Sequence, residues 1–237
     1  MRFAESVAIV TGGSGALGRY MTKAFLEEGA RVAVSYFIDA ELPELKELLG
    51  DLESSMNAYK VDVTSEEDVA SFVSEVLRDF GTVDILVNVV GGYMGGTPVS
   101  ETPLKDWDFM MDLNLKSAFI CCREVAPHME AKGRGKVINI SSRTGLQGEE
   151  GHAPYSVSKA GVIRLTESLA EELKERGINV NCIMPSIIDT PANRAAMPKA
   201  DYSKWPKPWE VARVILFLAS EDSELLHGSA IPVFGLS

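Results

Sequence analysis

Cysteine and histidine are scarce in this chain of 237 residues, which contains only three of each. The cysteines, Cys121, Cys122 and Cys182, are odd in number and lie in apolar segments, and neither they nor the histidines show metal-ligand spacing. We therefore expect buried, reduced thiols of the kind found in cytoplasmic proteins, with neither a disulfide framework nor a metal site.

Positive charge and long apolar runs are also lacking. The chain has 23 Lys and Arg against 34 Asp and Glu, and its net charge of −11 would be repelled by nucleic acid and by anionic membrane surfaces. No apolar stretch is long enough to span a membrane, and the first residues lead into a strand pattern without the shape of a signal peptide. These absences favour a cytoplasmic protein with no nucleic-acid or membrane partner.

What is present is an alternation of short apolar runs and helical patterns, in a chain that is 46% hydrophobic. The expected strands are residues 7–10, 31–36, 58–61, 84–87, 136–140, 179–184 and 230–233. The expected helices are residues 17–28, 41–49, 64–80, 104–128 in two pieces, 155–176 and 209–220. This alternation predicts a doubly wound, Rossmann-type α/β fold, with a parallel sheet of about seven strands and helices on both faces. Without a linker or repeat, residues 1–237 are expected to form a single domain.

A glycine-rich turn follows the first expected strand and leads into the first expected helix. It reads Thr11-Gly12-Gly13-Ser14-Gly15-Ala16-Leu17-Gly18. Glycines let a backbone approach a pyrophosphate closely, and a helix N-terminus supplies free N–H groups and partial positive charge. The order of strand, glycine turn and helix therefore favours a dinucleotide site over the alternative of an ordinary tight turn.

A tyrosine and a lysine stand four residues apart at the start of the helical pattern 155–176. Tyr155 and Lys159 should therefore project from one face of the helix, about one turn apart. A phenol has a pKa of about 10, and a nearby ammonium would lower that pKa by favouring the phenolate. Tyr155 is thus a candidate general acid and base. The alternative is a half-buried Tyr beside a solvated Lys on an ordinary amphipathic helix.

Polar residues also follow the ends of several expected strands, where ligands gather in open α/β sheets. Together with the features above, they resemble the short-chain dehydrogenase/reductase family over essentially the whole chain. The resemblance is carried by Thr11-Gly12, Asp62-Val63, Asn88, Asn114 within Leu113-Asn114-Leu115, and Ser142. Ser142 lies thirteen positions before Tyr155, a spacing typical of the family.

The resemblance implies an NAD(P)(H)-dependent enzyme that transfers hydride to a carbonyl group, such as a 3-oxoacyl group or another ketone. It assigns proton donation to Tyr155, lowering of the Tyr pKa and binding of the nicotinamide ribose to Lys159, and a hydrogen bond to the substrate oxygen to Ser142. Asn114 would hold a water in a proton relay, although a structural hydrogen bond is the alternative for this residue. The implied cofactor-binding residues are Thr11, Gly12, Gly13, Gly15, Ala16, Leu17, Gly18, Tyr36, Asp62, Val63, Asn88, Gly91, Tyr155, Lys159, Pro185, Ile188 and Thr190.

The sequence departs from the family pattern at three places near the cofactor. Ala16 replaces the middle glycine of the turn, Asn88-Val89-Val90-Gly91 replaces Asn-Asn-Ala-Gly, and Pro185-Ser186 replaces Pro-Gly. The choice between NAD and NADP is therefore left open, with a slight lean to NADP, because Tyr36 stands where NAD would need a carboxylate. Asp39 lies past that strand, while Arg19 and Lys60 are possible partners for the NADP phosphate.

Three segments also look like quinonoid dihydropteridine reductases, a group within the family. They are residues 12–18, residues 91–96, and residues 189–205. That group typically lacks the serine found here at Ser142, so a general carbonyl reductase is the first reading and a dihydropterin reductase the alternative. A non-catalytic dinucleotide sensor is a further alternative, which the complete Ser-Tyr-Lys set disfavours.

Two surfaces outside the cofactor site bear on the substrate and on assembly. The proline-rich segment 190–208 is expected to be irregular and to form an apolar lid with Met197, Tyr202 and Trp205, facing a wall that contains Tyr93 and Met94. The resemblance implies homotetramers or dimers that use the helical patterns 104–128 and 155–176. These helices carry wide apolar surfaces, for which burial inside a monomer is the alternative. The surfaces include Phe109, Phe119, Ile120, Val162, Ile163, Leu165 and Leu169.

Overall fold

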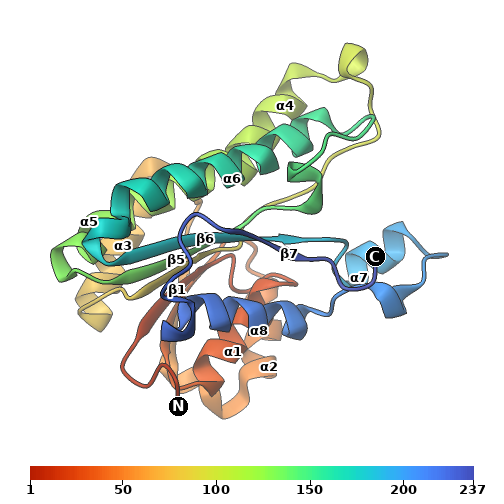
Figure 1. Ribbon diagram of the computed structural model, residues 1–237. Coiled ribbons are helices and arrows are strands. Elements are labelled where there is room, and N and C mark those ends of the chain that lie inside the picture. Colours follow the sequence, from red (N-terminus) through yellow and green to blue (C-terminus); the bar gives the residue numbers. More distant parts are fainter.

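Seven parallel strands form one sheet, in the order β3-β2-β1-β4-β5-β6-β7, in the computed structural model, which describes residues 1–237 (Figure 1). The strands are β1 (Val7–Thr11), β2 (Arg31–Tyr36), β3 (Met56–Lys60), β4 (Ile85–Asn88), β5 (Gly135–Ile140), β6 (Ile178–Pro185) and β7 (Ala230–Val233). The order changes direction between β1 and β4, so the chain winds first one way and then the other. The predicted doubly wound parallel sheet is confirmed.

Helices cover both faces of the sheet. The α-helices are α1 (Gly18–Glu27), α2 (Glu41–Leu49), α3 (Glu66–Phe80), α4 (Leu104–Met111), α5 (Ser117–Lys132), α6 (Ala153–Leu173), α7 (Pro191–Ala196) and α8 (Pro208–Ala219). Helices α1 and α8 lie on one face, and α3, α5 and α6 lie on the other (Figure 1). None of the helices is both long enough and apolar enough to cross a bilayer.

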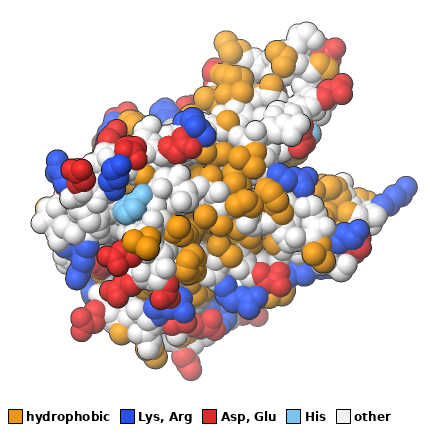
Figure 2. Space-filling model, viewed as in Figure 1, with side chains coloured by type: hydrophobic (Ala, Val, Ile, Leu, Met, Phe, Trp, Pro, Cys, Tyr) orange, Lys and Arg blue, Asp and Glu red, His pale blue; other side chains and the backbone are white.

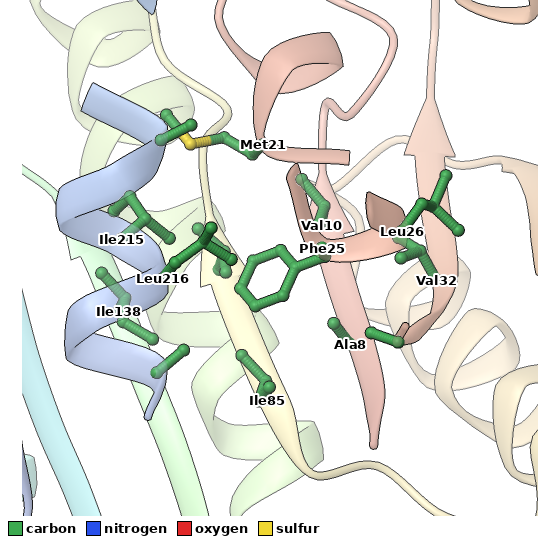
Figure 3. Packing of buried hydrophobic residues seen from close by; sticks show 14 of the residues in the cluster. Ala8, Val10, Met21, Phe25, Leu26, Val32, Ile85, Ile138, Ile215 and Leu216 are labelled. Atoms are coloured by element: carbon green, nitrogen blue, oxygen red, sulfur yellow. The ribbon is translucent and has the colours of Figure 1, made fainter. Parts of the chain in front are cut away.

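The core on the α1 side is built from apolar residues at helical spacing. Met21 and Phe25 of α1 are fully buried and meet Ile215 of α8 and Val10 of β1 (Figure 3). Strand positions buried on both faces explain why the strands read as continuous apolar runs rather than as alternating patterns. This packing fixes the carboxyl ends of β1 and β4, between which the glycine turn lies.

The helical pattern 104–128 is divided by a turn whose type and position the sequence does not predict. A single π-helical turn, η3 (Asp112–Lys116), joins α4 to α5, and α5 then continues through Pro127 to Lys132. The expected two pieces are present, although the second ends four residues later than expected. π-Turns of this kind insert an extra residue into a helix and are frequent at functional sites.

The proline-rich segment 190–208 is more regular than expected. Thr190 caps α7 by accepting a hydrogen bond from the backbone N–H of Asn193 at 3.2 Å, and Tyr202–Lys204 form a 3-10 turn. Pro191 occupies the first turn of α7, where its missing N–H costs nothing. The expectation of an irregular segment is therefore wrong for these residues.

Candidate active site

The glycine turn is fastened to the neighbouring strands by side chains at their ends. The Thr11 hydroxyl accepts hydrogen bonds from the backbone N–H groups of Val89 at 3.0 Å and Val90 at 3.3 Å, and so joins the ends of β1 and β4. The Ser35 hydroxyl at the end of β2 accepts from Gly12 N–H at 3.0 Å. Three strand ends therefore hold the turn in place.

Two glycines are needed for the shape of this turn. Gly12 has a φ of +59°, a region that side chains disfavour. A Cβ on Gly18 would lie 2.1 Å from the carbonyl oxygen of Gly12, so only glycine lets α1 start this close to β1. The other predicted residues of the turn, Gly13, Gly15, Ala16 and Leu17, lie between these two points. The turn fits the predicted role of approaching a pyrophosphate with its backbone.

Ser142 and Tyr155 lie together at the carboxyl end of β5. Ser142 follows β5 and accepts a hydrogen bond from the Thr144 hydroxyl at 3.0 Å, while its neighbour Ser141 is buried and donates to the Lys159 carbonyl at 2.7 Å. Burial raises the pKa of Tyr155, a hydrogen bond with Ser142 lowers it, and the charge of Tyr93 raises it. Ser142, and not Ser141, therefore acts on the candidate proton donor.

Lys159 is almost fully buried and has no carboxylate partner. Its Nζ donates to the Ile140 carbonyl at 2.9 Å, and burial lowers the pKa of the ammonium to about 8. The pKa of the Tyr155 phenol is raised overall in this structure, so the lowering expected from Lys159 stays a prediction. Desolvation of the phenol is the largest cause of the raised pKa.

Asn114 clamps the loop that follows β4. From within η3, its Oδ1 accepts from Gly92 N–H at 2.8 Å, while its Nδ2 donates to the Gly92 carbonyl at 3.1 Å and the Ser158 hydroxyl at 3.1 Å. A Cβ on Gly91 would lie 2.8 Å from Asn114 Oδ1 and 3.0 Å from Lys159 Nζ. The exposed Gly91 thus leaves room beside Lys159, as a nicotinamide ribose held by this lysine would require.

Asn88 has a different surrounding from the one expected of a cofactor ligand. Its amide nitrogen donates to Asn139 at 2.8 Å, and Asn139 donates to Thr166 at 2.9 Å, in a network buried between β4, β5 and α6. The Asn88 Oδ1 atom is buried without a hydrogen-bond partner. This side chain therefore ties the ends of β4 and β5 together.

The remaining predicted residues surround the same edge of the sheet. Asp62 Oδ1 accepts from the Thr64 backbone and hydroxyl at 2.9 and 2.6 Å, and Val63 is buried in the core. Pro185 ends β6, the Ile188 carbonyl accepts from Asn193, and Thr190 caps α7. They come from β3, β6 and the segment before α7, and parallel strands bring their carboxyl ends to one side.

The adenosine end of the site holds acidic residues that sequence reasoning missed. Beyond Tyr36, which ends β2, the Glu41 carboxylate accepts from the Ser14 hydroxyl at 2.7 Å. The two cations considered for an NADP phosphate are paired, Arg19 with Glu44 at 2.7 Å and Lys60 with Asp39 at 2.6 Å. No local pattern pairs Ser14 with Glu41, because the contact spans 27 residues.

The site opens into a hollow on the molecular surface. Figure 2 shows apolar side chains gathered between the projecting end of α4 and α6 and the part of the molecule that carries α7. Trp205 is buried, and its ring packs 4.9 Å from that of Tyr202, whose hydroxyl donates to the Met197 carbonyl at 3.1 Å. The aromatic residues of the expected lid therefore hold the segment together rather than line an open wall.

Sequence and structure comparisons agree with this geometry. The short chain dehydrogenase family model matches residues 6–201. A 3-oxoacyl-[acyl-carrier-protein] reductase of Thermotoga maritima is 33% identical, over 99% of this chain and 98% of that protein. Dehydrogenase/reductase SDR family member 6 of Rattus norvegicus is 31% identical, over 99% of this chain and 98% of that protein.

Two solved structures with a bound nicotinamide cofactor share the fold of this chain. An NAD+-bound xylitol dehydrogenase superposes with a TM-score of 0.92 at 27% identity, covering 99% of this chain and 100% of that one. ElxO with NADP bound superposes with a TM-score of 0.91 at 27% identity, covering 97% of each chain. Fold and site thus define an NAD(P)-dependent oxidoreductase built on a doubly wound sheet. The chain belongs to the short-chain dehydrogenase/reductase family.

Proposed function

We propose that this enzyme reduces the carbonyl group of a ketone to a secondary alcohol, and oxidises the alcohol in the reverse direction. One observation carries the proposal: at the carboxyl end of the sheet, the Ser142 hydroxyl acts on the Tyr155 phenol by lowering its pKa, and the buried Lys159 lies one helical turn further on. These two hydroxyls are suited to hold and protonate a carbonyl oxygen as negative charge develops on it. The relatives named as 3-oxoacyl reductases support this reaction class.

Each residue has a distinct part in the proposed reaction. A bound nicotinamide supplies the hydride. Ser142 positions the substrate oxygen, Tyr155 donates the proton, and Lys159 binds the nicotinamide ribose in the room left by Gly91. The side-chain amide of Asn114 is hydrogen-bonded to Gly92 and Ser158, so Asn114 fixes the loop beside the site. We propose that this loop, rather than the Asn114 side chain itself, orders the water of the proton relay.

The reaction class is tested by following nicotinamide absorbance with three substrates: a 3-oxoacyl thioester, a simple reactive ketone and freshly generated quinonoid dihydropterin. We expect turnover of at least one of the first two, and a strong loss of that turnover in Ser142→Ala. Turnover of the dihydropterin alone, with little effect of Ser142→Ala, would instead establish the dihydropterin reductase. Binding of a cofactor without turnover of any of the three would favour a sensor.

Charge at the adenosine end leads us to propose a preference for NAD(H), against the slight lean to NADP from the sequence. The Glu41 carboxylate lies within 3.9 Å of the place that a Cβ on Gly15 would occupy, above the glycine turn. A carboxylate there can accept a hydrogen bond from a ribose hydroxyl, whereas it repels a phosphate. It thereby supplies, from the start of α2, the acidic group missing from the end of β2.

Calorimetric titration with both cofactors tests this preference. Glu41→Gln should tighten NADP(H) binding by roughly five- to tenfold, the scale of an interaction of about 1 kcal/mol between exposed charges. Glu47→Gln, on the exposed face of the same helix, is the matched control and should leave both affinities unchanged. Tighter binding of NADP(H) than of NAD(H) by the unaltered enzyme would rule the proposal out.

We also propose how the molecule is organised and where it works. Residues 1–237 form one catalytic domain in which the segment 190–208 borders the substrate hollow as a lid. The three cysteines are free and buried, as suits a reducing cytoplasm. The active species is a homo-oligomer, a tetramer or dimer, joined through the α4–α5 and α6 surfaces.

A further inference from the structure

A pocket of about 270 Å3 opens next to the segment that carries the candidate catalytic tyrosine. Its walls include Tyr93, from the loop after β4, and Pro154, which precedes Tyr155 in the chain. The ring of Tyr93 meets that of Tyr155 edge-on, with centroids 5.1 Å apart. A substrate whose carbonyl reaches Tyr155 therefore places its neighbouring atoms against Tyr93.

The Tyr93 hydroxyl is part of a polar chain of three residues. It lies 2.7 Å from Nε2 of His152. The other ring nitrogen, Nδ1, makes no hydrogen bond of regular geometry, but the Glu149 carboxylate lies 3.3 Å from it. A carboxylate beside Nδ1 favours the tautomer that carries its proton there, which leaves Nε2 as the acceptor and Tyr93 as the donor.

The polar chain is built into the fold and is not a chance surface contact. The backbone N–H groups of Gly96 and Thr97 both donate to the Gly151 carbonyl, at 2.9 and 3.3 Å, and tie together the two loops that carry the chain. A Cβ on Gly95 would lie 2.1 Å from His152 Cδ2 and 2.5 Å from the Tyr93 hydroxyl oxygen. Glycine at this position is what permits the pair.

The charge around the pocket is negative. Asp106 lines it, the Glu149 carboxylate stands behind His152, and no Lys or Arg is among the lining residues. Arg194 is paired with Asp189, and the guanidinium of Arg143 lies 5.9 Å from the Phe234 ring. An anionic group seated in this pocket would therefore meet carboxylates, and no residue of the pocket lining would supply a cation.

We propose that Tyr93 is the specificity-determining residue of this pocket and selects uncharged ketones that carry a hydroxyl group beside the carbonyl. Because the Tyr93 proton is committed to His152, the phenolic oxygen offers lone pairs, and it binds a hydrogen-bond donor rather than an acceptor. A substrate hydroxyl meets that requirement, whereas a carboxylate, an ether or a plain methyl group does not. This inference rests on the proposed ketone reduction and names the substrate class of the same site.

Three small ketones of one skeleton test the inference. Hydroxyacetone carries the hydroxyl donor, methoxyacetone has the oxygen without the proton, and pyruvate carries an anion in its place. We expect kcat/KM to be highest for hydroxyacetone and lowest for pyruvate. Tyr93→Phe should lower kcat/KM for hydroxyacetone by tenfold or more, mainly through KM, and change that for methoxyacetone by less than twofold. Tyr59→Phe, on the edge strand β3 and hydrogen-bonded to Asp79, is the matched control.

Two results would overturn the inference. Equal losses for hydroxyacetone and methoxyacetone in Tyr93→Phe would mean that Tyr93 acts only by positioning Tyr155. Pyruvate turnover matching that of hydroxyacetone would refute the argument from charge.

A binding measurement separates this inference from the proposed reaction. Ligand-observed NMR on the enzyme with bound cofactor compares hydroxyacetone with methoxyacetone, with no turnover required. Preferential binding of hydroxyacetone that is lost in Tyr93→Phe supports the inference even if no ketone is reduced, an outcome that would instead refute the proposed function. Equal binding of the two ketones would refute the inference alone.

Discussion

Tyr155 combines a half-buried ring with a hydroxyl whose pKa the neighbouring Ser142 lowers, and this combination makes a conservative test possible. Its ring is held by the edge contact with Tyr93, which Tyr155→Phe preserves. The substitution removes only the phenolic oxygen, so we expect turnover to fall by roughly a hundredfold or more, the usual scale of general-acid catalysis, with an unchanged melting temperature. Steady-state kinetics and thermal unfolding measure the two effects. Near-normal turnover would show that Tyr155 is not the proton donor.

Burial of Lys159 disfavours the charged ammonium, although binding of the nicotinamide ribose is proposed to use that ammonium. We expect Lys159→Ala to lower both turnover and cofactor affinity, because the ammonium that would hold the nicotinamide ribose is lost. Kinetics with saturating cofactor and calorimetric titration separate the two losses. Lys136→Ala, a half-buried lysine of β5 that donates to Asn179, serves as the control and should affect neither. An unchanged cofactor affinity in Lys159→Ala would remove the ribose-binding role.

The same burial gives the stability of the enzyme a pH dependence. The pKa of Lys159 is lowered from 10.5 to about 8 on folding, so the folded state binds fewer protons than the unfolded chain between these values. Stability should therefore rise with pH from about 8 to about 10.5 by roughly 3 kcal/mol relative to Lys159→Met, which cannot titrate. Denaturant unfolding of both proteins at several pH values measures the difference. A difference that is flat across this range would mean that the lysine is not desolvated.

At the residue scale, helical spacing predicts that Tyr155 and Lys159 share one face, and the family resemblance adds Ser142, because these positions are fixed locally by a helix and a strand end. Spacing did not give the sign of the pKa change at Tyr155, which depends on burial by distant segments. It also did not reveal that the Asn88 side chain turns inward to Asn139, a contact across 51 residues. His152 had no local signal, because its partner Tyr93 lies 59 residues away.

At the scale of elements, one carboxylate, that of Asp189, holds the segment 190–208 in place through two ion pairs. The Asp189 side chain is 5% exposed and pairs with Arg194 at 2.8 Å and Lys207 at 2.5 Å. These hydrogen bonds hold the pKa of its carboxyl well below the usual range. The pairing contributes stability above the unfolded pKa of about 3.9, and this contribution is lost as pH falls toward the lower folded value. At neutral pH it keeps the two ends of the segment together.

Removing that carboxylate should loosen the segment without unfolding the sheet. We expect Asp189→Asn to speed amide hydrogen exchange within residues 190–208 at neutral pH, with little change in β1 to β6. Mass spectrometry of peptides from the exchanged protein reports this locally. Asp201→Asn, an exposed carboxylate of the same segment, is the control. Equal exchange in the two variants would mean that the Asp189 pairs do not hold the segment.

Element types were predictable because the apolar pattern carries them. β2, α2 and β7 begin and end at the expected residues, and most other boundaries differ by one to three residues. The π-turn at η3 could not be predicted, since the contacts of its Asn114 with Gly92 and Ser158 span 22 and 44 residues. The sequence does not predict the short helices in 190–208, because four prolines indicate an irregular backbone there, although Pro191 begins α7.

At the scale of the whole molecule, burial divides the apolar side chains expected on the outer helices. Ile120, Val162 and Ile163 are at most 3% exposed and belong to the monomer core, which corrects their assignment to an open surface. Phe109 and Phe119 remain 50% and 46% exposed. A shallow hollow on this face is lined by Met111, Asp112, Leu115, Lys116, Phe119 and Leu165. The apolar surface open to a second copy is therefore smaller than the sequence suggested and centres on Phe119.

This surface gives the last prediction, which concerns the oligomer. Light scattering should give a mass that is a multiple of 25.7 kDa. Phe119→Glu places a charge in the centre of the apolar surface, where association would bury it unpaired, so the measured mass should fall toward that of the monomer. Phe37→Glu, at a side chain 64% exposed beyond β2, should leave the mass unchanged. A monomeric unaltered protein would exclude the oligomer, and an unchanged mass in Phe119→Glu would place the contact elsewhere.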